Sequence, residues 1–274
     1  MTAAADVSSQ PVLMDKLEGG VMTLTLNRPE RLNALNAALV EALSAGVERA
    51  VADADCRAVL ITGAGRGFCA GADLADRAMT PGGARPDLGQ SLERGLNPII
   101  RAIRNLPKPV VCAVNGPAAG AGANLALACD IVLAAKSAQF LQAFARIGLI
   151  PDAGGTFVLP RLIGEARARA LMMLAEPIGA EQAQAVGMIY RAVDDQDLMG
   201  EAHTIAERLA AGPTHALGLI KRALAASPGN NLDAQLDLER DLQREAGAGD
   251  EYMEGVRAFL DKRPADFRRK PRLA

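Results

Sequence analysis

Residues 108–124 read KPVVCAVNGPAAGAGAN, a short apolar run followed by a segment made almost entirely of glycine and alanine. The run at 110–114 has the length and the valine content of a buried strand. A helix of small residues is expected over 119–128, and its first N–H groups and its dipole would favour negative charge. The stretch therefore predicts a strand that leads directly into a helix with an anion-binding start.

The same plan recurs along the chain. Residues 58–62 read AVLIT and lead into a second glycine-rich segment, and residues 130–135 read DIVLAA. Residues 21–26, VMTLTL, alternate as a strand does. Leucine and valine then recur every four residues, which predicts a helix within residues 33–54. Strands that alternate with helices predict an α/β fold.

The remaining chain divides into a surface segment and a helical C-terminal part. Residues 79–87, MTPGGARPD, are rich in turn formers and are expected to form a surface segment that acts as a lid. From about residue 181 onward the pattern is mostly helical. We expect a core over residues 1–200 that holds the ligand site, and a helical oligomerisation region over residues 201–274.

Composition narrows the class of protein. The 274 residues are 50% hydrophobic with a formal net charge of −2, so nothing indicates nucleic acid or a membrane as a partner. The N-terminal residues lack the pattern of a secretory signal, which favours the cytoplasm. The four cysteines show no paired spacing and are expected to be reduced, without zinc or disulfides. The two histidines lie far from the glycine-rich segments, which argues against a histidine-based triad.

Asp152 is the strongest candidate for a catalytic group. It lies in GLIPDAGGT, residues 148–156, where it interrupts apolar residues and glycines. Desolvation raises a carboxylate's pKa toward the range in which it can exchange protons at neutral pH. The alternative is that Asp152 is only a turn residue or a helix cap.

Two segments can present backbone N–H groups to a ligand. Residues 67–74, GFCAGADL, and residues 115–124 consist of small side chains that let a ligand approach the backbone. Two converging N–H groups would make an oxyanion hole. Each segment on its own is also compatible with close packing alone.

Four segments together resemble one family. They are residues 27–36 (NRPERLNALN), 68–74 (FCAGADL), 108–124 and 151–156 (PDAGGT). The order and the amino-acid sequences of these segments are similar to those of the enoyl-CoA hydratase/isomerase (crotonase) superfamily. The resemblance implies a spiral of strand-strand-helix units, a C-terminal helical trimerisation region, and acyl-CoA thioesters as ligands. It also implies a homotrimer or a dimer of trimers, with no cofactor apart from the coenzyme A of the substrate.

The resemblance also assigns residues. The oxyanion-hole amides fall on Ala72 and Ala121, which would hold the thioester oxygen as it becomes an enolate. The other positions implied for substrate or coenzyme A are Arg28, Leu32, Ala70, Asp73, Leu74, Asn124, Phe144 and Lys262. Alternatives stay open for two of them. Arg28 is also compatible with a solvated surface arginine, and Lys262 belongs to a basic tail that is also compatible with a solvated chain end.

The resemblance bears on the reaction as well. The two glutamates that hold water in family hydratases map to Asn124 and Phe144, and neither side chain can act as an acid or a base. Asp152 is then the remaining acid/base, which suits isomerisation: it removes an α-proton and returns it elsewhere. A dry wall of Phe144, Ile147 and Leu149 is expected to keep that proton from exchanging with water.

Within the family, three segments resemble the ring-1,2-epoxyphenylacetyl-CoA isomerases of bacterial phenylacetate degradation: residues 144–152, 217–221 and 232–240. The resemblance implies opening of an arene epoxide to an oxepin, or a shift of a 3-enoyl double bond to the 2-position. A hydratase of fatty-acid β-oxidation remains an alternative. A non-catalytic RNA-binding homologue is a minor one, because the helix within 33–54 carries no lysine.

Overall fold

The computed structural model describes residues 11–75 and 87–268. Within them a six-stranded sheet has the order β1-β2-β3-β4-β6-β9, and a three-stranded sheet has the order β5-β7-β8. The strands are β1 (Leu13–Glu18), β2 (Val21–Leu26), β3 (Ala58–Gly63), β4 (Val110–Val114), β5 (Ala118–Ala119), β6 (Ile131–Ala135), β7 (Gln139–Leu141), β8 (Ile178–Gly179) and β9 (Arg191–Val193).

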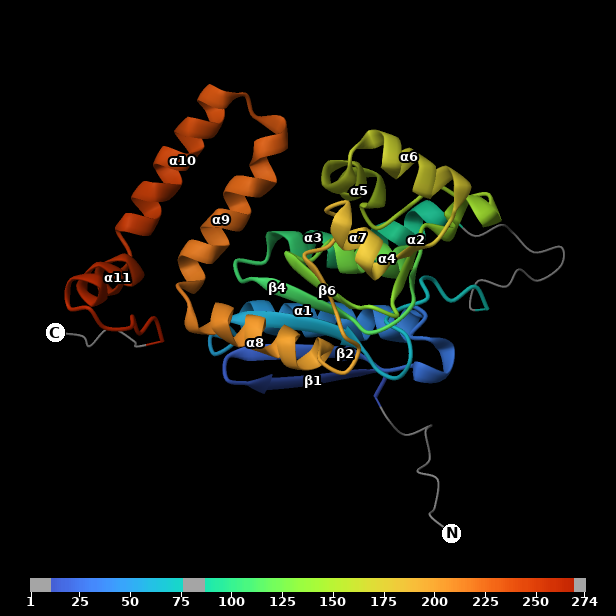
Figure 1. Cartoon of the computed structure of the whole chain (residues 1–274), viewed down its shortest axis with the longest axis horizontal. Helices are drawn as coiled ribbons and strands as arrows, with labels where there is room; N and C mark the ends of the chain where they lie inside the picture. The colour runs from blue at the N-terminus through green and yellow to red at the C-terminus, as the bar shows by residue number, and fades with distance from the viewer. Residues whose placement is uncertain (1–10, 76–86, 269–274) are drawn as a thin grey trace, which may run out of the picture.

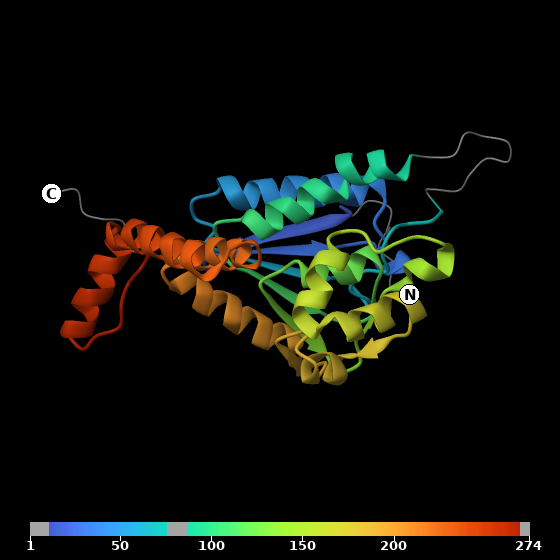
Figure 2. The same ribbon diagram turned by 90° about the horizontal axis from the view of Figure 1, so that it is seen from above.

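Helices cover both faces of the larger sheet. They are α1 (Ala37–Ala52), α2 (Leu88–Arg94), α3 (Leu96–Asn105), α4 (Ala121–Leu127), α5 (Gly155–Ile163), α6 (Glu165–Leu174), α7 (Ala180–Ala185), α8 (Leu198–Ala211), α9 (Thr214–Ala226), α10 (Leu232–Gly247) and α11 (Asp250–Leu260). Figure 2 shows α1 and α3 on one side of this sheet and α8 on the other. Because helices cover both faces, β3 and β4 are buried along almost their whole length.

The expected α/β class and the strand-strand-helix order are confirmed. The strand pair β1–β2 precedes α1, β4–β5 precedes α4, and β6–β7 precedes α5. Strands β2, β3, β4, β6 and β9 run parallel, so their carboxyl ends meet at one edge of the sheet. The segments that follow β3 and β4 therefore emerge beside each other.

Element bounds differ from the sequence predictions where a cap intervenes. The helix predicted within 33–54 begins only at Ala37, because the Asn36 side chain accepts a hydrogen bond from the Leu39 N–H and caps it. The small-residue helix predicted over 119–128 is α4, and Gly120 with φ 53° is its N-cap. A left-handed backbone at Gly120 ends the strand and starts the helix within one residue.

Of the C-terminal helices, α9 packs on α3, and α10 pairs with α9. Figure 1 shows α11 at the end of this pair that lies opposite the α9–α10 turn, and there Glu251 accepts hydrogen bonds from the N–H groups of His215 and Ala216. The expected division at residues 200 and 201 falls inside α8, which packs on β3 and β4. Most of the expected lid at 79–87 lies outside the described residues, and its last residue, Asp87, caps α2 through its side chain.

All four cysteines are buried free thiols. Among the helices of the described ranges, none combines the length and the apolar character needed to cross a membrane.

Candidate active site

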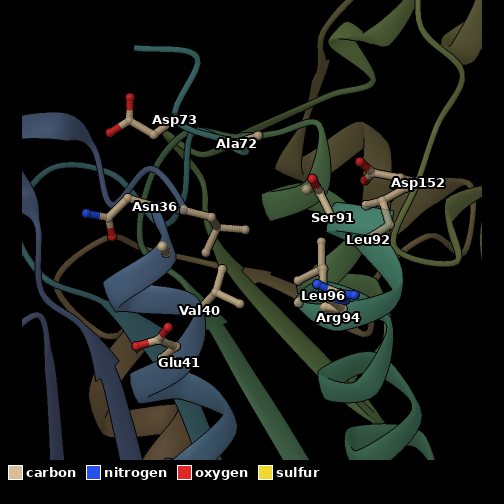
Figure 3. Close-up of a pocket in the computed structure, with 14 residues that line it drawn as sticks. Asn36, Val40, Glu41, Ala72, Asp73, Ser91, Leu92, Arg94, Leu96 and Asp152 are labelled. Atoms are coloured by element: carbon tan, nitrogen blue, oxygen red, sulfur yellow. The ribbon is translucent and has the colours of Figure 1, made fainter. Parts of the chain in front are cut away.

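A cavity of about 520 Å³ lies between α1, the α2–α3 pair and the start of α4. Figure 3 shows Asp152 on one side of this cavity and Asn36 on the other, with Ala72 between them. The residues that line it are Leu35, Asn36, Ala37, Val40, Glu41, Ala72, Asp73, Ser91, Leu92, Arg94, Gly95, Leu96, Ala121 and Asp152. The structure thus brings the three expected catalytic residues, Ala72, Ala121 and Asp152, to one cavity.

The Ala72 N–H is available to a ligand because of how its segment pairs. Ala72 forms an isolated parallel bridge with Leu35. In that bridge the Leu35 N–H donates to the Gly71 carbonyl at 2.7 Å, and the Asp73 N–H donates to the Leu35 carbonyl at 3.0 Å. Successive N–H groups of an extended chain point to opposite sides, so the Ala72 N–H is directed away from Leu35.

The second donor comes from the start of a helix. Ala121 is the first residue of α4, and an N–H in the first turn has no carbonyl acceptor within its own helix. The helix dipole adds partial positive charge at the same place. Ala121 therefore offers a donor to an anionic oxygen in the cavity that Ala72 also lines.

Two glycines let the segments of Ala72 and Ala121 approach each other. A Cβ on Gly71, which has φ 89°, would lie 2.7 Å from the Ala119 carbonyl oxygen. A Cβ on Gly122 would lie 2.3 Å from the Cys69 carbonyl oxygen. The Ala119 N–H also donates to the Cys69 carbonyl at 2.9 Å. The spacing of the two donors thus depends on the absence of these side chains.

Asp152 lies on the loop that precedes α5. Figure 3 shows its carboxylate pointing toward the side of the cavity where Ala72 and Ser91 lie. The alternative that Asp152 is a helix cap is wrong, because the N-cap of α5 is Gly154 and no side chain caps this helix. The Asp152 carbonyl does accept the Gly155 N–H at 2.9 Å, so the residue also takes part in a turn.

Arg28 is not a solvated surface arginine. Its Nη1 lies 3.0 Å from Asp73 Oδ2, and the side chains of the pair are only 14% and 10% exposed. Arg28 also donates to the Ala34 carbonyl. The hydrogen bond from Arg28 is the main cause that holds the pKa of Asp73 below its usual value. Arg28 therefore stabilises the segment that carries Ala72.

The other residues expected at the coenzyme A end lie beside this pair. Leu32 is half-buried, and its carbonyl accepts the Ala70 N–H at 2.9 Å. Ala70 and Leu74 are exposed. Lys262 follows the last residues of α11, which Figure 1 shows far from α2 and α4 in the same chain. A contact between Lys262 and this cavity would therefore have to come from another copy of the chain.

Asn124 and Phe144 lie behind the cavity lining. Asn124 is 1% exposed, and its side chain hydrogen-bonds to the Asp152 carbonyl and to Gln142. Phe144 is buried, with its ring next to Gly120. Ile147 and Leu149, expected as part of a dry wall, are exposed. The apolar wall is instead formed by Leu35, Val40, Leu92 and Leu96.

Sequence reasoning missed several residues of the site. Val40, Ser91, Leu92, Arg94 and Leu96 line the cavity from α1, α2 and α3. The four-residue apolar repeat was a usable signal for α1, but α2 follows the turn-rich segment and carries no motif. Cys69, which lies close to the oxyanion segments, is no candidate nucleophile, because burial raises the pKa of its thiol to about 12.

Known proteins resemble this chain over nearly its whole length. A family model described as enoyl-CoA hydratase/isomerase matches residues 16–270. A 1,2-epoxyphenylacetyl-CoA isomerase of Escherichia coli strain K12 is 54% identical over 255 residues, which cover 93% of this chain and 97% of that protein. A protein of Rhodobacter capsulatus named as a probable enoyl-CoA hydratase is 49% identical over 252 residues, 92% of this chain and 96% of the relative.

Solved structures of proteins named as enoyl-CoA hydratases also resemble this chain. The crystal structure of an enoyl-CoA hydratase from Polaromonas sp. JS666 superposes with a TM-score of 0.88 at 37% identity, covering 93% of this chain and 98% of that chain. The similarity covers both sheets and the C-terminal helices, since so little of either chain is left out.

Proposed function

Because the chain belongs to the enoyl-CoA hydratase/isomerase family, whose members act on acyl-CoA thioesters, we propose that it is an acyl-CoA isomerase with Asp152 as its acid/base. The Asp152 carboxylate removes a proton from the α-carbon of the acyl group. The N–H groups of Ala72 and Ala121 hold the thioester oxygen while it carries the enolate charge. Asp152 then returns the proton to another carbon, so the product has the composition of the substrate.

One observation carries this proposal. Asp152, Ala72 and Ala121 line the same cavity, and Figure 3 shows the Asp152 carboxylate directed toward the side where Ala72 lies. Such donors contribute a few kcal/mol each to a developing oxyanion. A base positioned at the proton contributes about 10²–10⁴-fold in rate. The apolar side chains of Leu35, Val40 and Leu92 keep water from the removed proton.

The 54% identity to a 1,2-epoxyphenylacetyl-CoA isomerase supports a ring-epoxide substrate and a role in phenylacetate catabolism. On this substrate, the reaction yields an oxepin with a double bond conjugated to the thioester carbonyl. A 3-enoyl-CoA requires the same proton removal from the α-carbon, and it is the second substrate that we propose.

The proposal is tested with Asp152→Asn. The asparagine keeps the size of the side chain but cannot take a proton, so we expect kcat to fall by about 10²-fold or more on epoxyphenylacetyl-CoA and on 3-hexenoyl-CoA. Asp55→Asn, at an exposed turn, is the matched control and should keep wild-type turnover. Wild-type turnover by Asp152→Asn on both substrates would exclude Asp152 as the base.

A hydratase is the second candidate, favoured by the name of the Rhodobacter relative. Water addition requires a group that activates water and one that protonates the α-carbon. Three carboxylates line the cavity, but Asp73 is paired with Arg28 and Glu41 comes from α1, so Asp152 is the carboxylate that we assign to proton transfer. We therefore expect crotonyl-CoA to keep its enoyl absorbance when it is mixed with the enzyme, and rapid loss of that absorbance would favour the hydratase.

We also propose that the chain assembles as a trimer or a dimer of trimers through its C-terminal helices. Large apolar side chains are exposed there, and exposed apolar patches of this kind mark interaction sites. They are Ile220, Leu224, Leu232, Leu236, Phe259 and Leu260.

A further inference from the structure

Two buried amide side chains hold the Asp152 loop from behind the cavity. The Asn124 Nδ2 of α4 donates to the Asp152 carbonyl oxygen at 2.9 Å. The Gln142 Nε2, directly after β7, donates to Asn124 Oδ1 at 2.8 Å. The two residues are 1% and 3% exposed, and neither is part of the cavity lining. A chain of two directional hydrogen bonds thus runs from the end of the smaller sheet to the proposed base.

The Asn124 amide packs closely against the backbone of Gly155, which leaves no room for a side chain at that position. A Cβ on Gly155 would lie 2.3 Å from Asn124 Nδ2 and 2.7 Å from Asn124 Oδ1. The loop also takes an unusual path, since Ala153 has φ 51° and Gly154 has φ 77°. A left-handed backbone at a residue other than glycine is strained and persists only where its surroundings hold it. The bond from Asn124 to the residue before Ala153 supplies such a restraint.

The direction of each hydrogen bond matters. An asparagine amide can turn over, which exchanges its oxygen with its nitrogen. Only one orientation presents Nδ2 to the Asp152 carbonyl, and in that orientation Oδ1 faces Gln142. The NH₂ group of Gln142 favours this orientation, because the reverse one would bring two NH₂ groups together and two oxygens together.

We propose that Gln142 and Asn124 are positioning residues for Asp152. Gln142 orients the Asn124 amide, and Asn124 fixes the Asp152 backbone so that the carboxylate stays opposite the N–H groups of Ala72 and Ala121. This inference rests on the proposed role of Asp152 as the base.

The presence of a glutamine at position 142 supports a role in orienting Asn124 by a hydrogen bond rather than a role in filling space. Gln142 Oε1 is buried and has no hydrogen-bond partner among residues 11–75 and 87–268. An unsatisfied buried acceptor costs free energy, and a methionine of similar volume would avoid that cost. The Nε2 bond to Asn124 is the one hydrogen bond that the Gln142 side chain makes within these residues.

The test uses two substitutions of Gln142 and one control. In Gln142→Glu the ionised side chain only accepts, so Asn124 turns its NH₂ toward it and loses the bond to the Asp152 carbonyl. We expect kcat at pH 8 to fall about tenfold or more, with KM changed less than twofold, because a displacement of 1 Å can cost about 100-fold. Gln142→Met should lose less activity, since it removes the orienting donor but adds no opposing acceptor. Gln139→Glu, exposed on β7, should match the wild type.

The pH dependence separates positioning from packing. Burial raises the pKa of a glutamate, and a protonated glutamate can donate its O–H to Asn124 Oδ1 as Gln142 does. The ratio of kcat in Gln142→Glu to wild-type kcat should therefore rise as pH falls from 8 to 6. In Gln142→Met, which has no titrating group, the ratio should stay constant. A ratio for Gln142→Glu that does not change with pH would overturn the proposal.

Hydrogen–deuterium exchange tests the positioning role without measuring catalysis, so its outcome does not depend on which reaction the enzyme carries out. The Gly155 N–H donates to the same Asp152 carbonyl, so hydrogen–deuterium exchange over residues 149–157 should accelerate in Gln142→Glu at pH 8 but not over β4. Full activity of Asp152→Asn would contradict the proposed reaction but would not affect the interpretation of this exchange experiment. A Gln142→Glu variant with wild-type exchange and wild-type kcat would show that Gln142 does not position Asp152. If Gln142→Glu exchanges rapidly throughout and so fails to fold, wild-type kcat in Gln142→Met would overturn the positioning role.

Discussion

At the scale of single residues, the Arg28–Asp73 pair links the stability of the oxyanion segment to pH. Arg28 holds the pKa of Asp73 below its ordinary value, so the folded state binds the proton less readily than the unfolded chain does. The stabilisation is fully present above the unfolded pKa, near 4, and is lost as pH falls through the lower folded pKa.

Arg28→Met should therefore lower the free energy of unfolding by about 1–2 kcal/mol at pH 7, since it removes hydrogen bonds to Asp73 and to the Ala34 carbonyl. The loss should be smaller at pH 3 than at pH 7, because the stabilisation begins to be lost once pH falls below the unfolded pKa of Asp73. Urea midpoints at both pH values measure this. Arg169→Met, which removes an exposed pair with Glu165, is the control and should cost less than about 0.5 kcal/mol. An equal loss at both pH values would contradict the assigned cause.

At the scale of helices and strands, the contact between α4 and residues 69–72 sets the distance between the two oxyanion donors. Gly122→Ala places a methyl group 2.3 Å from the Cys69 carbonyl oxygen, which must push the first turn of α4 away from Ala72. We expect kcat to fall about 100-fold in the folded variant, as for loss of one oxyanion donor. Gly200→Ala, in α8 with no atom within 4 Å of the new methyl group, should keep wild-type kcat. Steady-state kinetics on 3-hexenoyl-CoA measure both, and equal kcat values would remove the close contact from the mechanism.

The same scale shows what could be predicted from sequence. The strands at 21–26 and 110–114 were predicted to the residue, because glycine, proline or asparagine flanks each apolar pattern. Strand β1 was missed, since it lies at the sheet edge and five of its six residues are not buried. Asn124 could be excluded as an acid or base from its chemistry alone. Its hydrogen bond to the Asp152 backbone could not be predicted. The sequence does not show whether an asparagine side chain contacts the substrate or a backbone carbonyl 28 residues away.

At the scale of the whole molecule, α9 is attached firmly to the core and still exposes large apolar side chains. Lys221 Nζ lies 2.7 Å from Asp130 Oδ2 and also donates to the carbonyl of Lys108. A Cβ on Gly218 would lie 2.7 Å from the Pro107 carbonyl oxygen, so α9 lies close to the core backbone. These contacts hold the helix in place, and Ile220 and Leu224 remain exposed beside them, in a cavity that α9 forms with core residues such as Val158.

The proposed assembly predicts that these exposed apolar side chains of α9 are covered in solution. The mass measured by light scattering should be about three or six times the 28.5 kDa of one chain. Leu224→Glu places a charge at a side chain that is 66% exposed in the single chain, so it should leave the fold intact and reduce the mass toward one chain, because a buried unpaired charge costs several kcal/mol. Val51→Glu, at a 48% exposed position on α1, is the matched control and should keep the wild-type mass. A wild-type protein that elutes as a single chain, or a Leu224→Glu variant that keeps the full mass, would show that the exposed face of α9 is not a subunit contact.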